Sequence, residues 1–294
     1  MKDLVQDGDS LVGASGFEDG VDRRVFLKAA LGTGFAAAVL PVEAQTLVKT
    51  DTAGLSAGEH VIVIDGQDVP VYRAQPEGKP NAPVILVVSE IFGVHEHIKD
   101  VARRFAKQGY MALAPDLFVR AGDAAREPNI ADLMKNIVGK TPDAQVMSDL
   151  DTVVTWARQR GGDTARLGIT GFCWGGRITW LYAAHNPQVK AGVAWYGRLV
   201  GEPTANSPKH PIDIAQNLKT PVLGLYGAKD TGIPLDSVEK MRAALDKGNS
   251  GSAFHVYPNS GHAFHADYRP SFNEPDARDG WRRALDWFRK HGVA

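Results

Sequence analysis

One run of seven residues constrains the fold more than any other part of the sequence. Residues 83–89, Pro-Val-Ile-Leu-Val-Val-Ser, are almost entirely apolar. An unbroken apolar run of this length is typical of a strand that is buried on both faces. Such strands occur in parallel sheets, which helices cover from each side. The run therefore predicts a chain in which strands alternate with helices.

The rest of the chain follows that alternation. Further strands are predicted at 60–64, 69–73, 110–114, 165–170, 190–196, 221–226 and 252–257, and helices at 98–108, 129–138, 144–160, 175–185, 235–247 and 275–291. The first two strands form a hairpin around the turn 65–68. The pattern predicts one α/β domain with a mostly parallel, doubly wound sheet and an antiparallel N-terminal hairpin at its edge.

The N-terminus has the order of a twin-arginine (Tat) signal peptide. Arg23 and Arg24 precede an apolar stretch at 29–40, and Val42-Glu43-Ala44 offers small residues for cleavage. The stretch is shorter than the roughly 20 residues of a membrane span. We therefore expect a signal peptide at 1–44, a linker at 45–58 and the α/β domain at 59–294. The Tat translocase would be a partner, and the protein would be periplasmic or secreted without stable membrane insertion.

Composition and motifs exclude several classes of function. The 33 Lys and Arg residues nearly balance 34 Asp and Glu residues, so no nucleic-acid partner is expected. No glycine-rich nucleotide motif follows a strand, and we expect no cofactor. His95 and His97 lack a third candidate ligand, so no metal site is predicted. Cys173 is the single cysteine, which excludes an intramolecular disulfide.

Cys173 lies in a motif that exposes nucleophiles. The sequence Gly171-Phe172-Cys173-Trp174-Gly175-Gly176 joins a predicted strand to a predicted helix. This is the G-x-[SC]-x-G elbow, a tight turn that presents a side chain at the helix N-terminus. That position favours a thiolate and an oxyanion. The alternative is a small buried cysteine without a chemical role, which the surrounding glycines make the weaker interpretation.

A thiol nucleophile needs a base and a group that orients the base. His262 follows the strand 252–257 and is the best candidate for the base, with His265 as its competitor. Asp230 follows the strand 221–226 and, taken alone, would more often be a turn residue. The chain order nucleophile, acid, histidine is that of α/β-hydrolases. Glu90 ends the most apolar strand, where a carboxylate has either a raised pKa or an ion-pair partner.

Five ordered motifs resemble the dienelactone hydrolase (carboxymethylenebutenolidase) family. They extend from about residue 60 to the C-terminus and include cysteine in the elbow, which distinguishes the family from serine hydrolases. The motifs are Ser89-Glu90-Ile91-Phe92-Gly93-Val94, Ala114-Pro115-Asp116-Leu117-Phe118, Gly171-Phe172-Cys173-Trp174-Gly175-Gly176, Tyr226-Gly227-Ala228-Lys229-Asp230 and Gly261-His262-Ala263-Phe264.

The resemblance implies a role for each matching residue. Cys173, His262 and Asp230 would form a triad, with Glu90 holding the resting cysteine as a thiol and helping to form the thiolate when substrate binds. The backbone N–H groups of Ile91 and Trp174 would form the oxyanion hole.

The substrate-binding residues match the family less closely. Two arginines bind the substrate carboxylate in that family; Arg120 matches the first, whereas Ala266 occupies the position of the second. Arg269 is a candidate replacement from the same loop. Tyr196 ends a strand and either lines the pocket or packs in the core. Residues 120–145, rich in charge and short-helix patterns, are a candidate lid.

These observations predict a cysteine-dependent hydrolase of lactones or small esters that acts through an acyl-thioester on Cys173. It would be a monomer or a weak dimer. One alternative is an exported redox-sensing or ligand-binding protein on a hydrolase scaffold. Another retains the triad but hydrolyses an aryl ester or a thioester.

Overall fold

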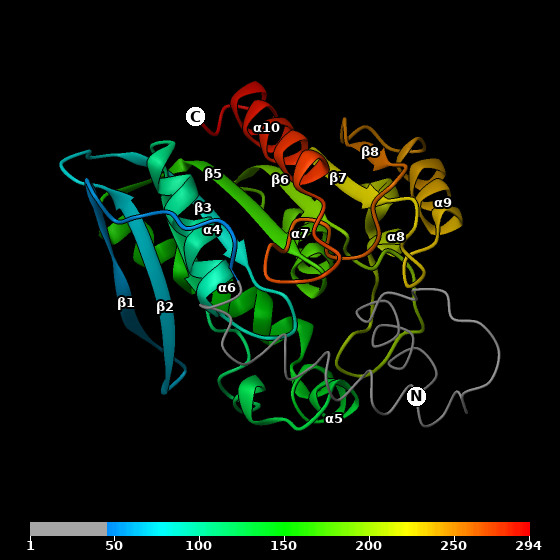
Figure 1. Ribbon diagram of the computed structural model, residues 1–294, viewed down its shortest axis with the longest axis horizontal. Helices are drawn as coiled ribbons and strands as arrows, with labels where there is room; N and C mark the ends of the chain where they lie inside the picture. Colours follow the sequence, from blue (N-terminus) through cyan, green and yellow to red (C-terminus); the bar gives the residue numbers. More distant parts are fainter. Residues whose placement is uncertain (1–45) are drawn as a thin grey trace.

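The computed structural model describes residues 46–294, which build an eight-stranded sheet (Figure 1). The order across the sheet is β1-β2-β4-β3-β5-β6-β7-β8. The strand β2 is antiparallel to both β1 and β4, and the pairings from β4 to β8 are parallel. The bounds are β1 (Leu55–Ile64), β2 (Gln67–Pro76), β3 (Ala82–Val88), β4 (Met111–Pro115), β5 (Gly162–Phe172), β6 (Val189–Trp195), β7 (Val222–Gly227) and β8 (Ala253–Tyr257).

The helices lie between the strands, as the sequence predicts. Short helical segments that it did not predict are α8 and the 3-10 turn η3, whereas η1 and η2 lie within residues 120–145, where the sequence has short-helix patterns. The bounds are α4 (Glu96–Lys107), η1 (Ala124–Arg126), α5 (Ile130–Asn136), η2 (Val138–Lys140), α6 (Asp143–Gln159), α7 (Trp174–His185), α8 (Pro211–Ile214), η3 (Ala215–Asn217), α9 (Leu235–Leu245) and α10 (Glu274–Lys290).

The N-terminal hairpin differs from the prediction in two respects. The strand β1 begins at Leu55, so the last four residues of the expected linker, 55–58, pair with β2 instead. The turn has two residues, Asp65 and Gly66, rather than four, because Ile64 pairs directly with Gln67. Both turn residues have a positive φ, 51° and 78°, which the sequence Asp-Gly favours in a tight hairpin. The expected signal peptide lies outside the described residues.

Both faces of the sheet are buried, as the apolar run at 83–89 requires. Alternate residues of β3 enter two different hydrophobic clusters. Ile85 and Val87 pack with residues of α4 and α10, whereas Val84, Leu86 and Val88 pack with residues of α6 and α7. A side-chain period of two places successive residues on opposite faces. The parallel strands therefore end along one edge, where their following loops meet.

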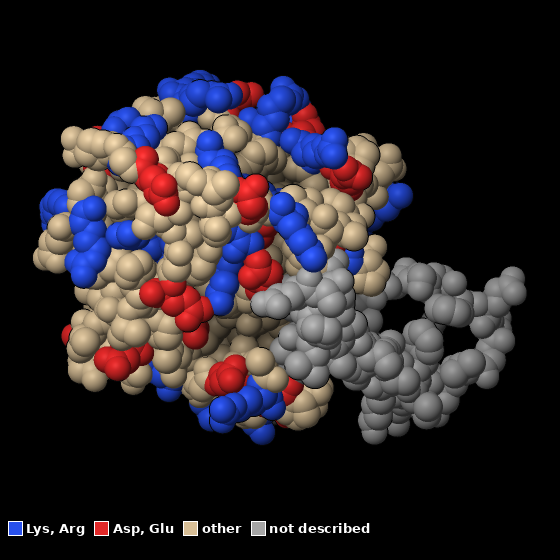
Figure 2. All heavy atoms as spheres, turned by 60° about the vertical axis from the view of Figure 1, so that its left-hand side comes forward, with Lys and Arg blue, Asp and Glu red and all other residues tan. Residues whose placement is uncertain are grey.

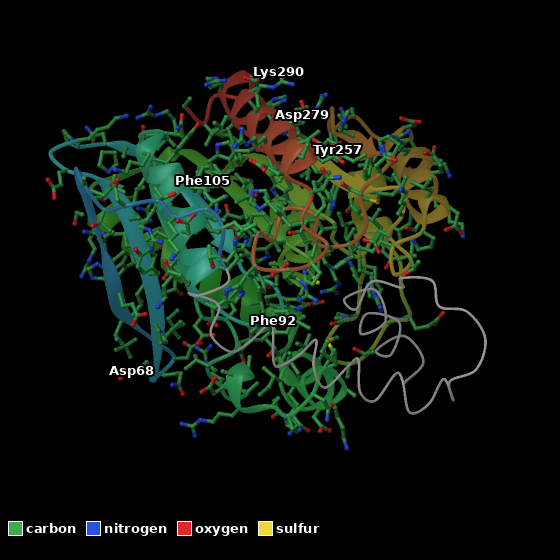
Figure 3. The ribbon with its side chains drawn as sticks, viewed as in Figure 1. Asp68, Phe92, Phe105, Tyr257, Asp279 and Lys290 are labelled. Atoms are coloured by element: carbon green, nitrogen blue, oxygen red, sulfur yellow. The ribbon has the colours of Figure 1, made fainter. Side chains whose placement is uncertain are left out.

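The last helix covers the sheet on the side of α4 (Figure 1). Its Phe288 contacts Phe105 of α4, with 6.0 Å between the ring centroids. The hydroxyl of Tyr257, at the end of β8, donates to Asp279 Oδ2 of α10 at 3.0 Å, and these two residues lie close together in Figure 3. Hydrophobic packing against α4 and this polar contact with the end of β8 together hold α10 in place.

Residues 46–53, which we call the N-terminal strap, cross α4 and reach the loop after β8. The N–H of Val48 donates to Asp267 Oδ2 at 2.6 Å. The N–H of Thr50 donates to Asp100 Oδ1 at 2.5 Å. The strap therefore connects the first helix of the domain to the loop that carries the predicted catalytic histidine.

The surface agrees with the near-zero formal charge of −1. On the face shown in Figure 2, lysine and arginine side chains are interspersed with aspartate and glutamate. Among residues 46–294, no helix has both the length and the hydropathy of a membrane span.

Candidate active site

Cys173 lies between β5 and α7, in the strand-to-helix turn that the elbow motif predicts. Its φ of 53° and ψ of −113° are unusual for a residue with a side chain. A Cβ on Gly175 would lie 2.3 Å from the carbonyl oxygen of Val88, and one on Gly176 would lie 2.5 Å from that of Trp195. Because a side chain at either position would collide with backbone, both glycines are needed for this turn.

The structure brings His262 and Asp230 together with Cys173. His262 Nδ1 lies 2.7 Å from Asp230 Oδ2, and the two side chains are 4% and 0% exposed. Asp230 Oδ1 accepts the N–H groups of Gly232 and Ile233, each at 3.0 Å, which fixes the carboxylate. Burial lowers the pKa of His262, but the charge of Asp230 and the interactions with Cys173 raise it well above 6.5. Asp230 and an ionised Cys173 therefore both stabilise the protonated form of the ring.

Glu90 follows the end of β3, at the same edge of the sheet as Cys173. Val88 of β3 pairs with Gly171 of β5. Glu90 is two residues beyond Val88 and Cys173 is two residues beyond Gly171, so both leave the sheet at the same level. Glu90 is fully buried, and its Oε2 accepts a hydrogen bond from the hydroxyl of Tyr268. Among the described residues, Oε1 has no hydrogen-bond partner. One carboxylate oxygen is thus held and the other remains available.

Tyr196 is the second strained residue at this edge, with a φ of 37°. It is fully buried, and its ring centroid lies 5.1 Å from that of His262. Its hydroxyl has no hydrogen-bond partner among the described residues. Burial, and then the nearby Glu90, raise the pKa of this phenol well above 10, so it remains an O–H donor. Both interpretations left open above fit this position, because Tyr196 lines the cavity and also belongs to a hydrophobic core cluster.

A cavity of about 390 Å³ opens over the thiol. Ile91 and Trp174 line it beside Cys173, as expected for the two residues of an oxyanion hole. Trp174 is the first residue of α7, so its N–H has no acceptor within the helix. Met134 of α5 also lines the cavity, together with part of η2. The candidate lid therefore contributes to the wall of the cavity.

The two predicted substrate-binding arginines lie outside the cavity lining. Arg120 Nη1 pairs with Asp149 Oδ2 at 2.5 Å, and its Nη2 donates to the carbonyl of Ile64 at 3.0 Å. Arg269 is buried, with its guanidinium 5.5 Å from the ring centroid of Phe92. The sequence spacing places both residues near the correct loops, but neither guanidinium reaches the lining.

The prediction missed other charged residues that do line the cavity. They are Arg177, Arg198, Glu202 and His210. Asp143 already holds Arg177 through two contacts of 2.7 Å. Arg198 comes three residues after the end of β6, and the rule that reactive groups gather at the carboxyl ends of parallel strands could have identified it.

The histidines near the site have different environments. His265, the competitor for the role of base, lacks a carboxylate partner among the described residues and stacks on Phe172, with 5.1 Å between the ring centroids. Burial and the charge of Arg104 lower its pKa well below 6.5. His97 instead pairs with Asp267 at 2.6 Å in the interior. Within residues 46–294, no group of three or more potential ligands is arranged to hold a metal ion.

Comparisons with known proteins agree with these features. A model of the dienelactone hydrolase family matches residues 69–292. A provisionally named carboxymethylenebutenolidase of Methylorubrum extorquens is 59% identical over 276 residues, which are 93% of this chain and 94% of the relative. A provisionally named carboxymethylenebutenolidase of Escherichia coli K12 is 53% identical over 261 residues, 88% of this chain and 96% of the relative.

A solved structure supports the same relationship. The crystal structure of a provisionally named dienelactone hydrolase from Klebsiella pneumoniae has a TM-score of 0.79 and 57% sequence identity, and the match covers 80% of this chain and 99% of the other. The resemblance in the five motifs and the predicted α/β-hydrolase fold are therefore confirmed. This chain belongs to the dienelactone hydrolase family and is a hydrolase of that kind.

Proposed function

We propose that this hydrolase cleaves lactones or small esters through a thioester on Cys173. The observation that carries the proposal is the placement of the only thiol in the chain at a strained helix start, within reach of a histidine that a buried aspartate orients. A nucleophile, a base and an orienting group in this order are what acyl transfer requires.

The reaction begins with the sulfur protonated beside Glu90. As the substrate carbonyl approaches, His262 takes the thiol proton and the sulfur attacks the carbonyl carbon. Collapse of the tetrahedral intermediate breaks the ester C–O bond, and His262 gives its proton to the leaving oxygen. Water then loses a proton to His262 and attacks the thioester. The C–S bond breaks, the acid is released and the proton returns to sulfur.

Three groups around the cavity would act on the substrate during these steps. The N–H groups of Ile91 and Trp174 would donate to the oxyanion that develops on the carbonyl oxygen. The hydroxyl of Tyr196, which has no partner among the described residues, would donate to a second substrate oxygen. Removal of one oxyanion donor typically costs on the order of 10² to 10³ in kcat.

A substrate carboxylate would bind at Arg198. This residue lines the same cavity as Cys173 and His262, whereas Arg120 and Arg269 do not. A charge-assisted hydrogen bond is worth roughly 1.5–3 kcal/mol. The proposal therefore transfers the role that the family gives to two arginines to a different position in the chain.

Intact-protein mass spectrometry tests the proposal directly. The protein is mixed with 4-nitrophenyl acetate and, separately, with a carboxylated dienelactone. We expect a transient acyl adduct on Cys173, no adduct in Cys173→Ala and none in His262→Ala. His185→Ala is the matched control, because His185 pairs with Asp151 at the same 2.7 Å on the surface. Full turnover in Cys173→Ala would refute the mechanism. No adduct and no turnover with either compound would favour the redox-sensing or ligand-binding alternative.

We also propose that residues 1–44 direct export by the Tat pathway and that the exported enzyme is a monomer or a weak dimer. A variant with Arg23→Lys and Arg24→Lys should remain in the cytoplasm, whereas Lys28→Arg should be exported normally. Fractionation of the producing cells measures the distribution. Equal export of both variants would contradict the signal, and light scattering of the exported protein tests the oligomeric state.

A further inference from the structure

The hydrogen bond between Tyr268 and Glu90 is buried and connects two distant parts of the sequence. It joins residues 178 positions apart, from the loop after β8 to the end of β3. Tyr268 is 5% exposed and Glu90 is fully buried. A buried carboxylate that is ionised needs donors, since burial alone favours its neutral form. Tyr268 supplies one such donor, at Oε2.

The surroundings of Tyr268 fix the direction of this hydrogen bond. Burial, and then the charge of Glu90, raise the pKa of the phenol well above 10, so the hydroxyl keeps its proton and donates. The ring lies edge-on to His95, with 4.8 Å between the centroids, and 5.3 Å from His97. The guanidinium of Arg269 lies 5.9 Å from the ring centroid. This packing fixes the position of the Tyr268 ring, so the hydrogen bond from its hydroxyl restricts rotation of the Glu90 carboxylate.

The backbone next to Tyr268 is also anchored. Asp267 pairs with His97 in the interior at 2.6 Å and accepts the N–H of Val48 in the N-terminal strap at 2.6 Å. The N–H of Arg269, on the other side, donates to the carbonyl of Ala266 at 3.0 Å. Tyr268 therefore approaches Glu90 from a segment that is held at both ends.

We infer that Tyr268 is a positioning residue for Glu90, holding Oε2 so that Oε1 is left to accept a hydrogen bond from the thiol of resting Cys173. The inference rests on the proposed function, in which Glu90 lies beside a protonated sulfur before substrate binds. Without the phenol, Oε2 loses its donor and Oε1 is no longer held against the thiol. A hydrogen bond from the neutral thiol favours its protonated form, so the loss of that bond lets the resting thiol ionise at a lower pH.

The test measures the pH dependence of Cys173 alkylation by iodoacetamide, with Cys173 as the only thiol in the chain. Tyr268→Phe should lower the midpoint by about one pH unit, a tenfold change in ionisation, and should lower kcat more than it changes KM. In a Glu90→Gln background the same substitution should leave the midpoint unmoved, because the coupling acts through Glu90.

A control of the same chemistry is available elsewhere in the fold. Tyr182→Phe also removes a buried phenol that donates to a carboxylate, that of the partly exposed Asp151 at 2.9 Å. Neither residue lines the cavity, so this substitution should leave the midpoint unchanged. An unmoved midpoint in Tyr268→Phe would overturn the inference, as would an equal shift in both backgrounds. Should Tyr268→Phe not fold, Tyr268→His keeps a ring N–H donor and should retain the wild-type midpoint; a shift of one unit there would overturn the inference.

This readout separates the inference from the proposed function. Alkylation needs an accessible thiol but no ester turnover. A coupled shift in an enzyme that hydrolyses no ester would support the positioning role and refute the hydrolysis. Cysteine-dependent hydrolysis with no shift of the alkylation midpoint in Tyr268→Phe would support the proposed function and refute the positioning role of Tyr268.

Discussion

Replacing Asp230 with asparagine is the most informative single change at this site. Asp230 Oδ1 accepts two backbone N–H groups at 3.0 Å, from Gly232 and Ile233. Asparagine would keep its carbonyl oxygen at that position, because the amide nitrogen cannot accept those donors. Its NH₂ would then face His262 Nδ1, where Asp230 Oδ2 lies at 2.7 Å in the native protein. The substitution therefore reverses the direction of this hydrogen bond.

The reversal determines the size of the effect. With a donor facing Nδ1, the neutral His262 ring carries its proton on Nε2, the nitrogen that should accept the proton of Cys173. Loss of the charge-assisted hydrogen bond alone costs roughly 1.5–3 kcal/mol, about 10- to 150-fold in rate. Adding the wrong tautomer brings the expected loss in kcat to about 10² to 10⁴. The pKa of His262 should also fall, since the charge of Asp230 helps to raise it.

Steady-state hydrolysis of 4-nitrophenyl acetate, measured from pH 5 to 9, gives kcat and KM for each variant. Asp151→Asn is the matched control, because it removes the same charge from a surface histidine at the same 2.7 Å. The control should stay within about twofold of the native protein. A kcat within threefold of native in Asp230→Asn, with the fold intact by circular dichroism, would refute the triad assignment.

Three further predictions concern stability, specificity and the elbow. Asp267→Ala should lower the free energy of unfolding by about 3–5 kcal/mol, because it leaves His97 buried without its partner. Burial alone would raise the pKa of Asp267, but the interaction with His97 outweighs burial and lowers this pKa below 3.8. The stabilisation is therefore complete above pH 3.8 and is lost as the pH falls through the folded-state pKa. Thermal denaturation measured against pH should show that the difference in stability between Asp267→Ala and the native protein becomes smaller in acid. Arg198→Gln should raise KM about tenfold for a carboxylated ester and little for its neutral analogue in parallel assays, and equal changes for both would remove Arg198 from substrate binding. Gly175→Ala should abolish turnover, because the added Cβ would lie 2.3 Å from the carbonyl oxygen of Val88; native kcat in this variant would contradict the geometry of the turn.

The order of strands and helices could be predicted because it depends on local patterns. The apolar run at 83–89 specified a strand buried on both faces, and the elbow glycines specified the turn at Cys173. The competitor His265 could be set aside only in the structure, where His262 alone of the two contacts Asp230. Both histidines follow the same strand, and spacing does not show which one has a carboxylate partner.

The residues that line the cavity were harder to predict because side-chain direction depends on packing. Arg120 lies in the expected loop, but Asp149 of α6 and the carbonyl of Ile64 hold its guanidinium outside the cavity lining. The contact of Tyr268 with Glu90 joins residues 178 positions apart. No local pattern in the sequence contains such a contact.

The N-terminal strap has a consequence for the order of events during synthesis. Val48 leaves the ribosome early, yet its partner Asp267 follows 219 residues later. A contact of such high sequence separation forms only after the intervening sheet has closed the loop. A nascent chain that stops before Asp267 can therefore form most of the sheet but cannot anchor the loop of His262 to the strap. Catalytic competence is expected to appear only after Asp267 has left the ribosome.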